Sequence, residues 1–107
     1  MNEVDGIKVK PTHPGEVLLE DYLKPLGITP NALAIAIRVP ASRISEIVKA
    51  KRAVTAETAL RLTRYFGGDP DFWLRLQARY DRCVAEDTVG ATIDREVVPR
   101  ELVATRQ

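Results

Sequence analysis

Residues 39–52 read VPASRISEIVKAKR, and this stretch predicts the helix around which the fold is organised. Pro40 suits a helix start, because its fixed φ fits the first helical positions and its missing N–H is not needed there. Three apolar residues then follow at the i, i+3, i+4 spacing that places them on one helical face. They are Ile44, Ile47 and Val48. The opposite side carries Ser42, Glu46 and Lys49, with Arg43 and Ser45 on the flanks.

Positive charge is concentrated around this helix. Residues 38–52 hold five basic side chains against the single acid Glu46, whereas the whole chain has a formal net charge of only +1. A basic cluster on one short helix is typical of a protein that reads DNA. An ordinary solvent-exposed helix can have the same composition, so this segment alone leaves both interpretations open.

Two helices are predicted before this segment. The residues His13-Pro14-Gly15-Glu16 form a helix-start signal, and Pro25 with Gly27 ends the first helix. Its apolar face is expected to consist of Leu19, Tyr22, Leu23 and Leu26. The second helix starts at Thr29-Pro30 and presents Leu33, Ala34 and Ile37 inward. Two short helices joined by a turn at residues 38–40 make a helix-turn-helix.

Two further helices and a tail are predicted after the basic segment. Thr55 and Asp69 are cap residues, and Gly67-Gly68 separates the two helices. The longest apolar stripe follows, with Phe72, Trp73, Leu76, Tyr80, Cys83 and Val84. Residues 88–93 are rich in strand formers, and Gly90 discourages a continuing helix. We therefore expect an arm at 1–12, a helical domain at 13–86, and a tail at 87–107 that is strand, short helix or disordered.

Length and composition limit the class of protein. A chain of 107 residues with 45% hydrophobic and 29% charged residues is typical of one soluble globular domain. No apolar run approaches the roughly 20 residues that a membrane helix needs, and the N-terminus lacks the apolar core of a signal peptide. Cys83 is the only cysteine, which excludes an internal disulfide. These features predict a cytoplasmic protein that does not act at a membrane.

Residues suited to catalysis or metal binding are few. His13 is the only histidine, and it stands beside a proline at a helix start with no cluster of ligands around it. Cys83 belongs to an apolar stripe, where free cysteines are commonly buried and inert. Asp69 and Asp71 are explained as a cap and a first-turn acid. We therefore expect no enzymatic activity, no cofactor and no metal.

Four motifs carry a resemblance to a known family. They are HPGE at 13–16, RISEI at 43–47, TAETALRL at 55–62 and FWLRLQARYD at 72–81. Together, residues 13–84 resemble the HigA-type antitoxins of bacterial toxin–antitoxin modules, which belong to the lambda-repressor-like helix-turn-helix superfamily. The resemblance implies an all-α, five-helix bundle of that type, to which the composition of residues 88–93 adds a short tail that can form a strand.

The resemblance also implies a function and partners. It implies an antitoxin that neutralises a HigB-type toxin, a RelE-like ribonuclease that cleaves messenger RNA on the ribosome. It implies a homodimer that binds double-stranded operator DNA and represses its own operon, and we expect the last helix and the tail to form the dimer surface. The alternative is a stand-alone helix-turn-helix transcriptional regulator without a toxin.

The expected DNA-binding residues lie on and around the helix at residues 41–48. They are Thr29, Arg38, Ala41, Ser42, Arg43, Ser45, Glu46, Lys49, Lys51 and Arg52. Ser42 and Arg43 are expected at base edges, whereas the cations after residue 48 are expected at the DNA backbone. Glu46 either accepts from a cytosine amino group or, as we favour, holds Arg43 in position.

Three positions differ from the family's usual pattern. Pro30 stands where the family usually has a glutamine, a residue that can hold a phosphate. Ile35 stands where a basic or polar residue is common, and Arg38 stands where the turn normally has a glycine. A left-handed conformation at Arg38 would cost about 1–2 kcal/mol.

Overall fold

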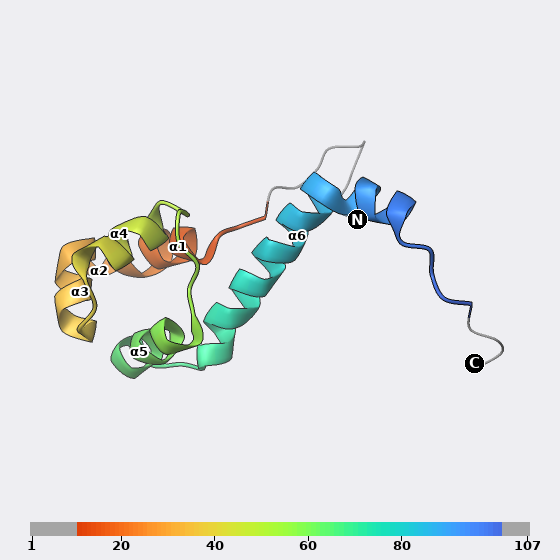
Figure 1. Cartoon of the computed structure of the whole chain (residues 1–107). Helices are drawn as coiled ribbons and strands as arrows, with labels where there is room; N and C mark the ends of the chain where they lie inside the picture. The colour runs from red at the N-terminus through yellow and green to blue at the C-terminus, as the bar shows by residue number, and fades with distance from the viewer. Residues whose placement is uncertain (1–10, 102–107) are drawn as a thin grey trace.

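Five successive helices are formed by residues 11–101, the part of the chain that the computed structural model describes (Figure 1). The first is continuous through three segments, α1 (Pro14–Val17), the π-helix η2 (Leu18–Leu23) and α2 (Lys24–Leu26). The others are α3 (Pro30–Ile37), α4 (Ala41–Val48), α5 (Ala56–Phe66) and α6 (Pro70–Glu96). No strand is present between residues 11 and 101, so the fold is the expected all-α helix-turn-helix bundle.

The predicted caps begin three of the helices. The hydroxyl of Thr29 accepts from the Ala32 N–H at 3.0 Å, and the hydroxyl of Thr55 accepts from the Thr58 N–H at 3.3 Å. A carboxylate oxygen of Asp69 accepts from the N–H of the second residue of α6 at 2.9 Å. Each bond satisfies a backbone donor that has no partner inside its own helix.

The first helix differs from the predicted amphipathic pattern in its middle. The buried residues are Leu18 and Leu23, whereas Leu26, which was expected on the apolar face, is 59% exposed. These two leucines are five residues apart, a spacing that shares a face in the wider π turn. The N–H of Lys24 accordingly donates to the Leu19 carbonyl, five residues back. We attribute the wider turn to Pro25, because proline has no N–H to donate and its ring clashes with the carbonyl four residues earlier.

The core lies where the helices meet. Its fully buried side chains come from every helix, and Trp73 is the largest of them at 1% exposure. The buried residues predicted from spacing include Leu33, Ala34, Ile37, Ile44 and Ile47, and Ala59 and Leu62 of α5 are buried with them. Tyr22 and Phe66 pack on the core with ring centroids 4.9 Å apart. These contacts hold α3 and α4 as a unit against α1 and α5.

Of the alternatives left open for the tail after Glu86, the strand is wrong for the described residues, and a helix is present through Glu96. Helix α6 runs without interruption to Glu96 and extends beyond the bundle in Figure 1. An internal glycine costs a helix only about 1 kcal/mol, and an established helix adds residues cooperatively. The side chain of Arg82 also pairs with Glu86 at 3.0 Å. Residues 88–93 have no neighbouring strand within residues 11–101 with which a strand could pair.

Helix α6 also passes through position 86, where the sequence predicted the end of the domain. None of the helices between residues 11 and 101 is apolar over a stretch long enough to cross a bilayer.

Candidate nucleic-acid interface

The turn between α3 and α4 sets the direction in which α4 runs. Arg38 is left-handed, with φ 64° and ψ 47°, although it is not a glycine. The Val39 N–H donates to the Ala34 carbonyl at 3.0 Å, which closes the end of α3. Pro40 is extended and precedes the first residue of α4, so the predicted helix start is displaced by one residue. This turn makes α3 and α4 a helix-turn-helix.

Helix α4 is anchored by one face and open on the other. Ile44 and Ile47 have no exposed surface, so the apolar stripe read from the sequence holds the helix to the core. Ala41 and Ser42 are exposed at its first turn. Three more predicted site residues are half-buried, namely Arg43, Ser45 and Glu46. The N-terminal half of α4 therefore presents short polar groups and one arginine to solvent.

The segment after α4 folds back toward the same face. Ala50 has a left-handed φ of 61°, and the Lys51 N–H donates to the Glu46 carbonyl at 2.8 Å. This reversal brings the Arg52 guanidinium to Glu46, with Nε and Oε1 2.7 Å apart. Our preferred role for Glu46 is thereby wrong, because within the described residues it holds Arg52 and not Arg43.

Helix α1 supports α4 from the core side because Gly15 has no side chain. A Cβ built on Gly15 would lie 1.7 Å from the Ile47 carbonyl oxygen, far inside any allowed contact. The two backbones are therefore in direct contact. The Gly15 N–H donates to the Nδ1 atom of His13 at 2.8 Å, so the residue before Pro14 is the cap of this helix. The HPGE motif thus positions α4.

His13 has a structural role, as expected. Its side chain is buried, and its ring meets Tyr80 edge-on with centroids 4.8 Å apart. Burial lowers the pKa of the His13 imidazole below its ordinary value of 6.5, and the Asp81 carboxylate opposes this effect. The imidazole is therefore favoured in the neutral form that accepts the cap bond.

Gln77 fastens the segment between α4 and α5 to α6. Its side chain is 7% exposed, and its Oε1 atom accepts from the Val54 N–H at 2.8 Å. Its Nε2 atom donates to the Asp81 carboxylate at 3.0 Å. The buried amide therefore satisfies a backbone donor two residues after Arg52 and limits where that arginine can lie.

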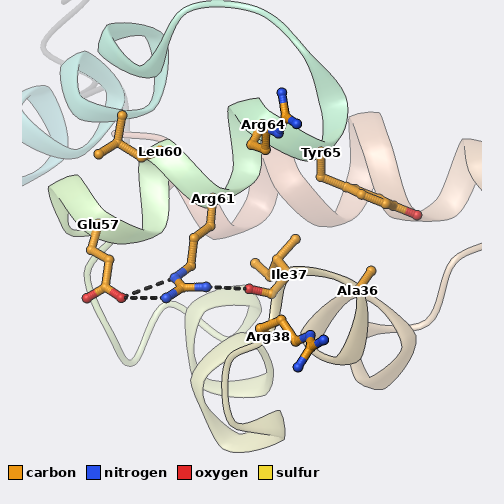
Figure 2. A pocket seen from close by; sticks show the side chains of 8 residues that line it. All are labelled: Ala36, Ile37, Arg38, Glu57, Leu60, Arg61, Arg64 and Tyr65. Carbon is orange, nitrogen blue, oxygen red and sulfur yellow. Dashed lines mark hydrogen bonds and ion pairs between the residues drawn. The ribbon is translucent and has the colours of Figure 1, made fainter.

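Arg61 joins α3 to α5 in the groove drawn in Figure 2. Its Nη1 atom donates to the Ile37 carbonyl at 2.9 Å, and its Nη2 atom lies 3.0 Å from the Glu57 carboxylate. The groove has a volume of about 570 Å³, and Leu60, Arg64 and Tyr65 line its α5 side. The bond to Ile37 satisfies a carbonyl at the end of α3 that has no partner within the helix. The groove thus contains part of the framework that holds the helix-turn-helix.

The predicted site residues other than Thr29 lie on α4 or in the segments directly before and after it. Arg38 lies in the turn before α4, and the three cations Lys49, Lys51 and Arg52 follow α4 and are exposed. Thr29 lies at the opposite end of α3, which at 1.5 Å per residue is about 12 Å from the turn. Its hydroxyl caps α3, so its place in the site is separate from the others.

Three residues that position the site were missed in the sequence. Gly15, Arg61 and Gln77 all lie outside the helix-turn-helix and act on it through contacts across the core. A signal was present for Gln77, a polar residue four positions after Trp73 on the buried face of its helix. Nothing in the sequence distinguished Arg61 from other surface arginines.

Comparisons with known proteins agree with this geometry. A helix-turn-helix family profile matches residues 19–73. Virulence-associated protein I of Dichelobacter nodosus is 58% identical over 74 residues, which are 69% of this chain and 68% of that protein. The HTH-type transcriptional regulator YbaQ of Escherichia coli K12 is 40% identical over 80 residues, 75% of this chain and 71% of that protein. Antitoxin HigA-1 of Vibrio cholerae is 36% identical over 74 residues, 69% of this chain and 70% of that protein.

Solved structures of antitoxins share the fold. An addiction module antidote protein of the HigA family from Coxiella burnetii has a TM-score of 0.80 and 40% identity, covering 86% of this chain and all of that one. The Pseudomonas aeruginosa antitoxin HigA, solved with the higBA promoter, has a TM-score of 0.83 and 38% identity with the same coverage. The relatives named here include antitoxins and a transcriptional regulator, beside one virulence-associated protein. The chain therefore belongs to the helix-turn-helix family and, within it, to the HigA-type antitoxins.

Proposed function

We propose that this protein is a cytoplasmic antitoxin that represses its own operon. As a homodimer it binds operator DNA through α4, and it neutralises a HigB-type toxin, a RelE-like ribonuclease. The observation that carries the proposal is the open face of α4, where exposed polar residues and one arginine stand on an anchored helix within a basic surface. The Pseudomonas aeruginosa HigA was solved with promoter DNA, which supports the same use of this fold.

The residues of the site divide between reading bases and holding the DNA backbone. In a helix-turn-helix the first residues of the second helix meet base edges, which assigns that role to Ala41, Ser42 and Arg43. An arginine pairs with guanine, a hydroxyl bonds several bases, and a methyl group contacts thymine. The phosphate contacts come from the other site residues, which are Thr29, Arg38, Ser45, Lys49, Lys51 and Arg52.

Toxin binding uses a different surface from α4. Repression and neutralisation by one molecule require that the DNA-reading face stay free while the toxin is bound. The toxin is therefore expected to contact helices away from the turn at residues 38–40, and DNA-reading substitutions are expected to leave neutralisation intact.

The experiment combines operator binding with protection from the toxin. Arg43→Ala is expected to weaken binding to the upstream DNA of the gene by about 1–3 kcal/mol, mainly on the cognate sequence. Arg79→Ala removes the same charge from an exposed position on α6 and should leave DNA binding unchanged. Cells that express the partner toxin should survive with Arg43→Ala. A folded Arg43→Ala protein that neither binds DNA nor protects cells would contradict the separation of surfaces.

The second candidate function is a stand-alone transcriptional regulator. The 40% identical Escherichia coli relative, which is named as a regulator, favours it. The two functions are distinguished by the neighbouring gene. An adjacent short reading frame for a small basic protein that co-purifies with this chain supports the antitoxin, and its absence supports the regulator.

A further inference from the structure

The acidic residue Glu46 lies within the basic surface that we assign to DNA. It is the only acid between residues 38 and 52, and it is on α4, the helix that we assign to the major groove of the DNA. Its carboxylate pairs with Arg52 at 2.7 Å, and the two side chains remain 41% and 45% exposed. The phosphates of DNA repel a carboxylate. Close to DNA, Glu46 therefore needs a compensating partner, which is either Arg52 or a hydrogen-bond donor on the DNA.

The backbone around Arg52 is held on both sides. Before it, the left-handed Ala50 and the bond from the Lys51 N–H to the Glu46 carbonyl reverse the chain. After it, the Val54 N–H is bonded to the buried Gln77. The Arg52 side chain can therefore change partner while the main chain stays in place. Both side chains of the Glu46–Arg52 ion pair are partly exposed. Such pairs contribute little net stability, so Arg52 can exchange Glu46 for another partner at a low cost in free energy.

The chemistry of the bases decides when the exchange occurs. In the major groove a carboxylate can accept only from the amino groups of cytosine and adenine. Over a non-cognate sequence Glu46 meets no donor, and Arg52 stays with it. Over a cytosine or adenine placed opposite α4, the base amino group replaces Arg52 as the partner of Glu46.

We propose that Arg52 is a conditional phosphate contact, which Glu46 withholds from non-cognate DNA and releases to the backbone only on the cognate sequence. This inference rests on the proposed operator binding. It makes Glu46 a specificity-determining residue, because an amino group at one base pair adds both its own hydrogen bond and a phosphate contact.

The test measures affinity against salt concentration on two duplexes, the upstream operator and a scrambled sequence of equal composition. Each phosphate contact contributes about 0.9 to the slope of log K against log salt. Arg52→Gln should lower the slope on the operator by about 0.9 per protomer and leave the scrambled duplex unchanged. Lys51→Gln is the matched control, because within residues 11–101 Lys51 pairs with no carboxylate. It should lower both slopes equally.

Glu46→Gln should release Arg52 on every sequence. Affinity for the scrambled duplex is expected to rise several-fold, with a slope steeper by about 0.9 per protomer. The double variant Glu46→Gln/Arg52→Gln should restore the original slope on scrambled DNA. A scan of operator base pairs should show a preference for cytosine or adenine at one position in the wild-type protein that Glu46→Ala loses; alanine is used here because a glutamine can itself bond adenine.

Two results would overturn the inference while leaving the proposed function intact. The first is an equal loss of slope on both duplexes with Arg52→Gln, and the second is no loss on either. If the wild-type protein does not distinguish operator from scrambled DNA, the proposed operator binding fails and the inference fails with it.

Discussion

At the scale of single residues, His13 caps the first helix with a group that can take up a proton, its imidazole. Neutral Nδ1 accepts from the Gly15 N–H, and a protonated ring cannot. Because burial lowers the pKa of His13 below 6.5, the unfolded chain binds the proton more readily than the folded one. The stability that the cap contributes is present above pH 6.5 and is lost as the pH falls through the lower folded value.

This predicts a pH-dependent free energy of unfolding. The free energy of unfolding of the wild-type protein, measured with urea, should decrease as the pH is lowered from about 7.5 to about 5. His13→Ser keeps a capping oxygen and has no imidazole, so its stability should change less over this range. Equal slopes for the two proteins would show that His13 is not the group that titrates.

Arg38 illustrates a conflict between stability and the proposed DNA contact. Its left-handed φ of 64° is costly for arginine and is readily adopted by glycine, so Arg38→Gly should stabilise the fold by up to about 1 kcal/mol. The same change removes a phosphate contact, so operator affinity should fall and the salt slope should decrease by about 0.9 per protomer.

Ala50→Gly is the control for Arg38→Gly. Ala50 has a similar φ of 61° and no charge. It should raise the melting temperature by a comparable amount and leave the salt dependence of DNA binding unchanged. Loss of stability in both variants would show that relief of left-handed strain does not outweigh the added freedom that glycine gives the unfolded chain at these turns.

At the scale of elements, the contact between α1 and α4 depends on Gly15. Gly15→Ala places a Cβ 1.7 Å from a backbone oxygen of α4, and backbone cannot move aside as a side chain can. We expect destabilisation at or above the upper end of the usual range of about 1–3 kcal/mol for overpacking, measured by chemical denaturation. Operator affinity should also fall in the remaining folded protein, because α4 must shift.

Gly90 on α6 provides the matched control for Gly15. A Cβ there meets no atom closer than 4.0 Å, and alanine is the better helix former. Gly90→Ala should therefore stabilise the protein by up to about 1 kcal/mol and leave DNA binding unchanged. A mild effect of Gly15→Ala, similar to that of Gly90→Ala, would mean that α1 and α4 separate easily.

At the scale of the whole molecule, we propose that the outer half of α6 joins two copies into a homodimer. Beyond the bundle this helix exposes Val89 and Ile93 on one side, at 44% and 48%. Paired half-sites one DNA turn apart are the usual way in which a short reading helix gains affinity. A second copy would cover an apolar face that the bundle leaves open.

Sedimentation at tens of micromolar tests the dimer. The wild-type chain should sediment as a dimer, and Val89→Lys/Ile93→Lys should be monomeric and bind operator DNA weakly. Ala91→Lys adds a charge at a nearby exposed position and should leave the dimer intact. A wild-type chain that is monomeric with and without operator would contradict the proposal, and a dimer that survives the double substitution would place its interface elsewhere.

The sequence by itself determined the number of helices, their starts and the anchored face of α4. Caps, prolines, glycine stops and apolar spacing act over a few residues and can be read directly from the chain. Only the tertiary structure decided the length of α6, the π turn before Pro25 and the partner of Glu46. Helix α6 is long because a strand at residues 88–93 would have no neighbouring strand to pair with. The π turn depends on how the first helix accommodates Pro25, and the partner of Glu46 depends on a chain reversal at Ala50 that no local sequence pattern predicts. Contacts between residues far apart in the chain, such as Gly15 with Ile47 and Gln77 with Val54, form only when separate helices pack, so spacing within one helix cannot reveal them.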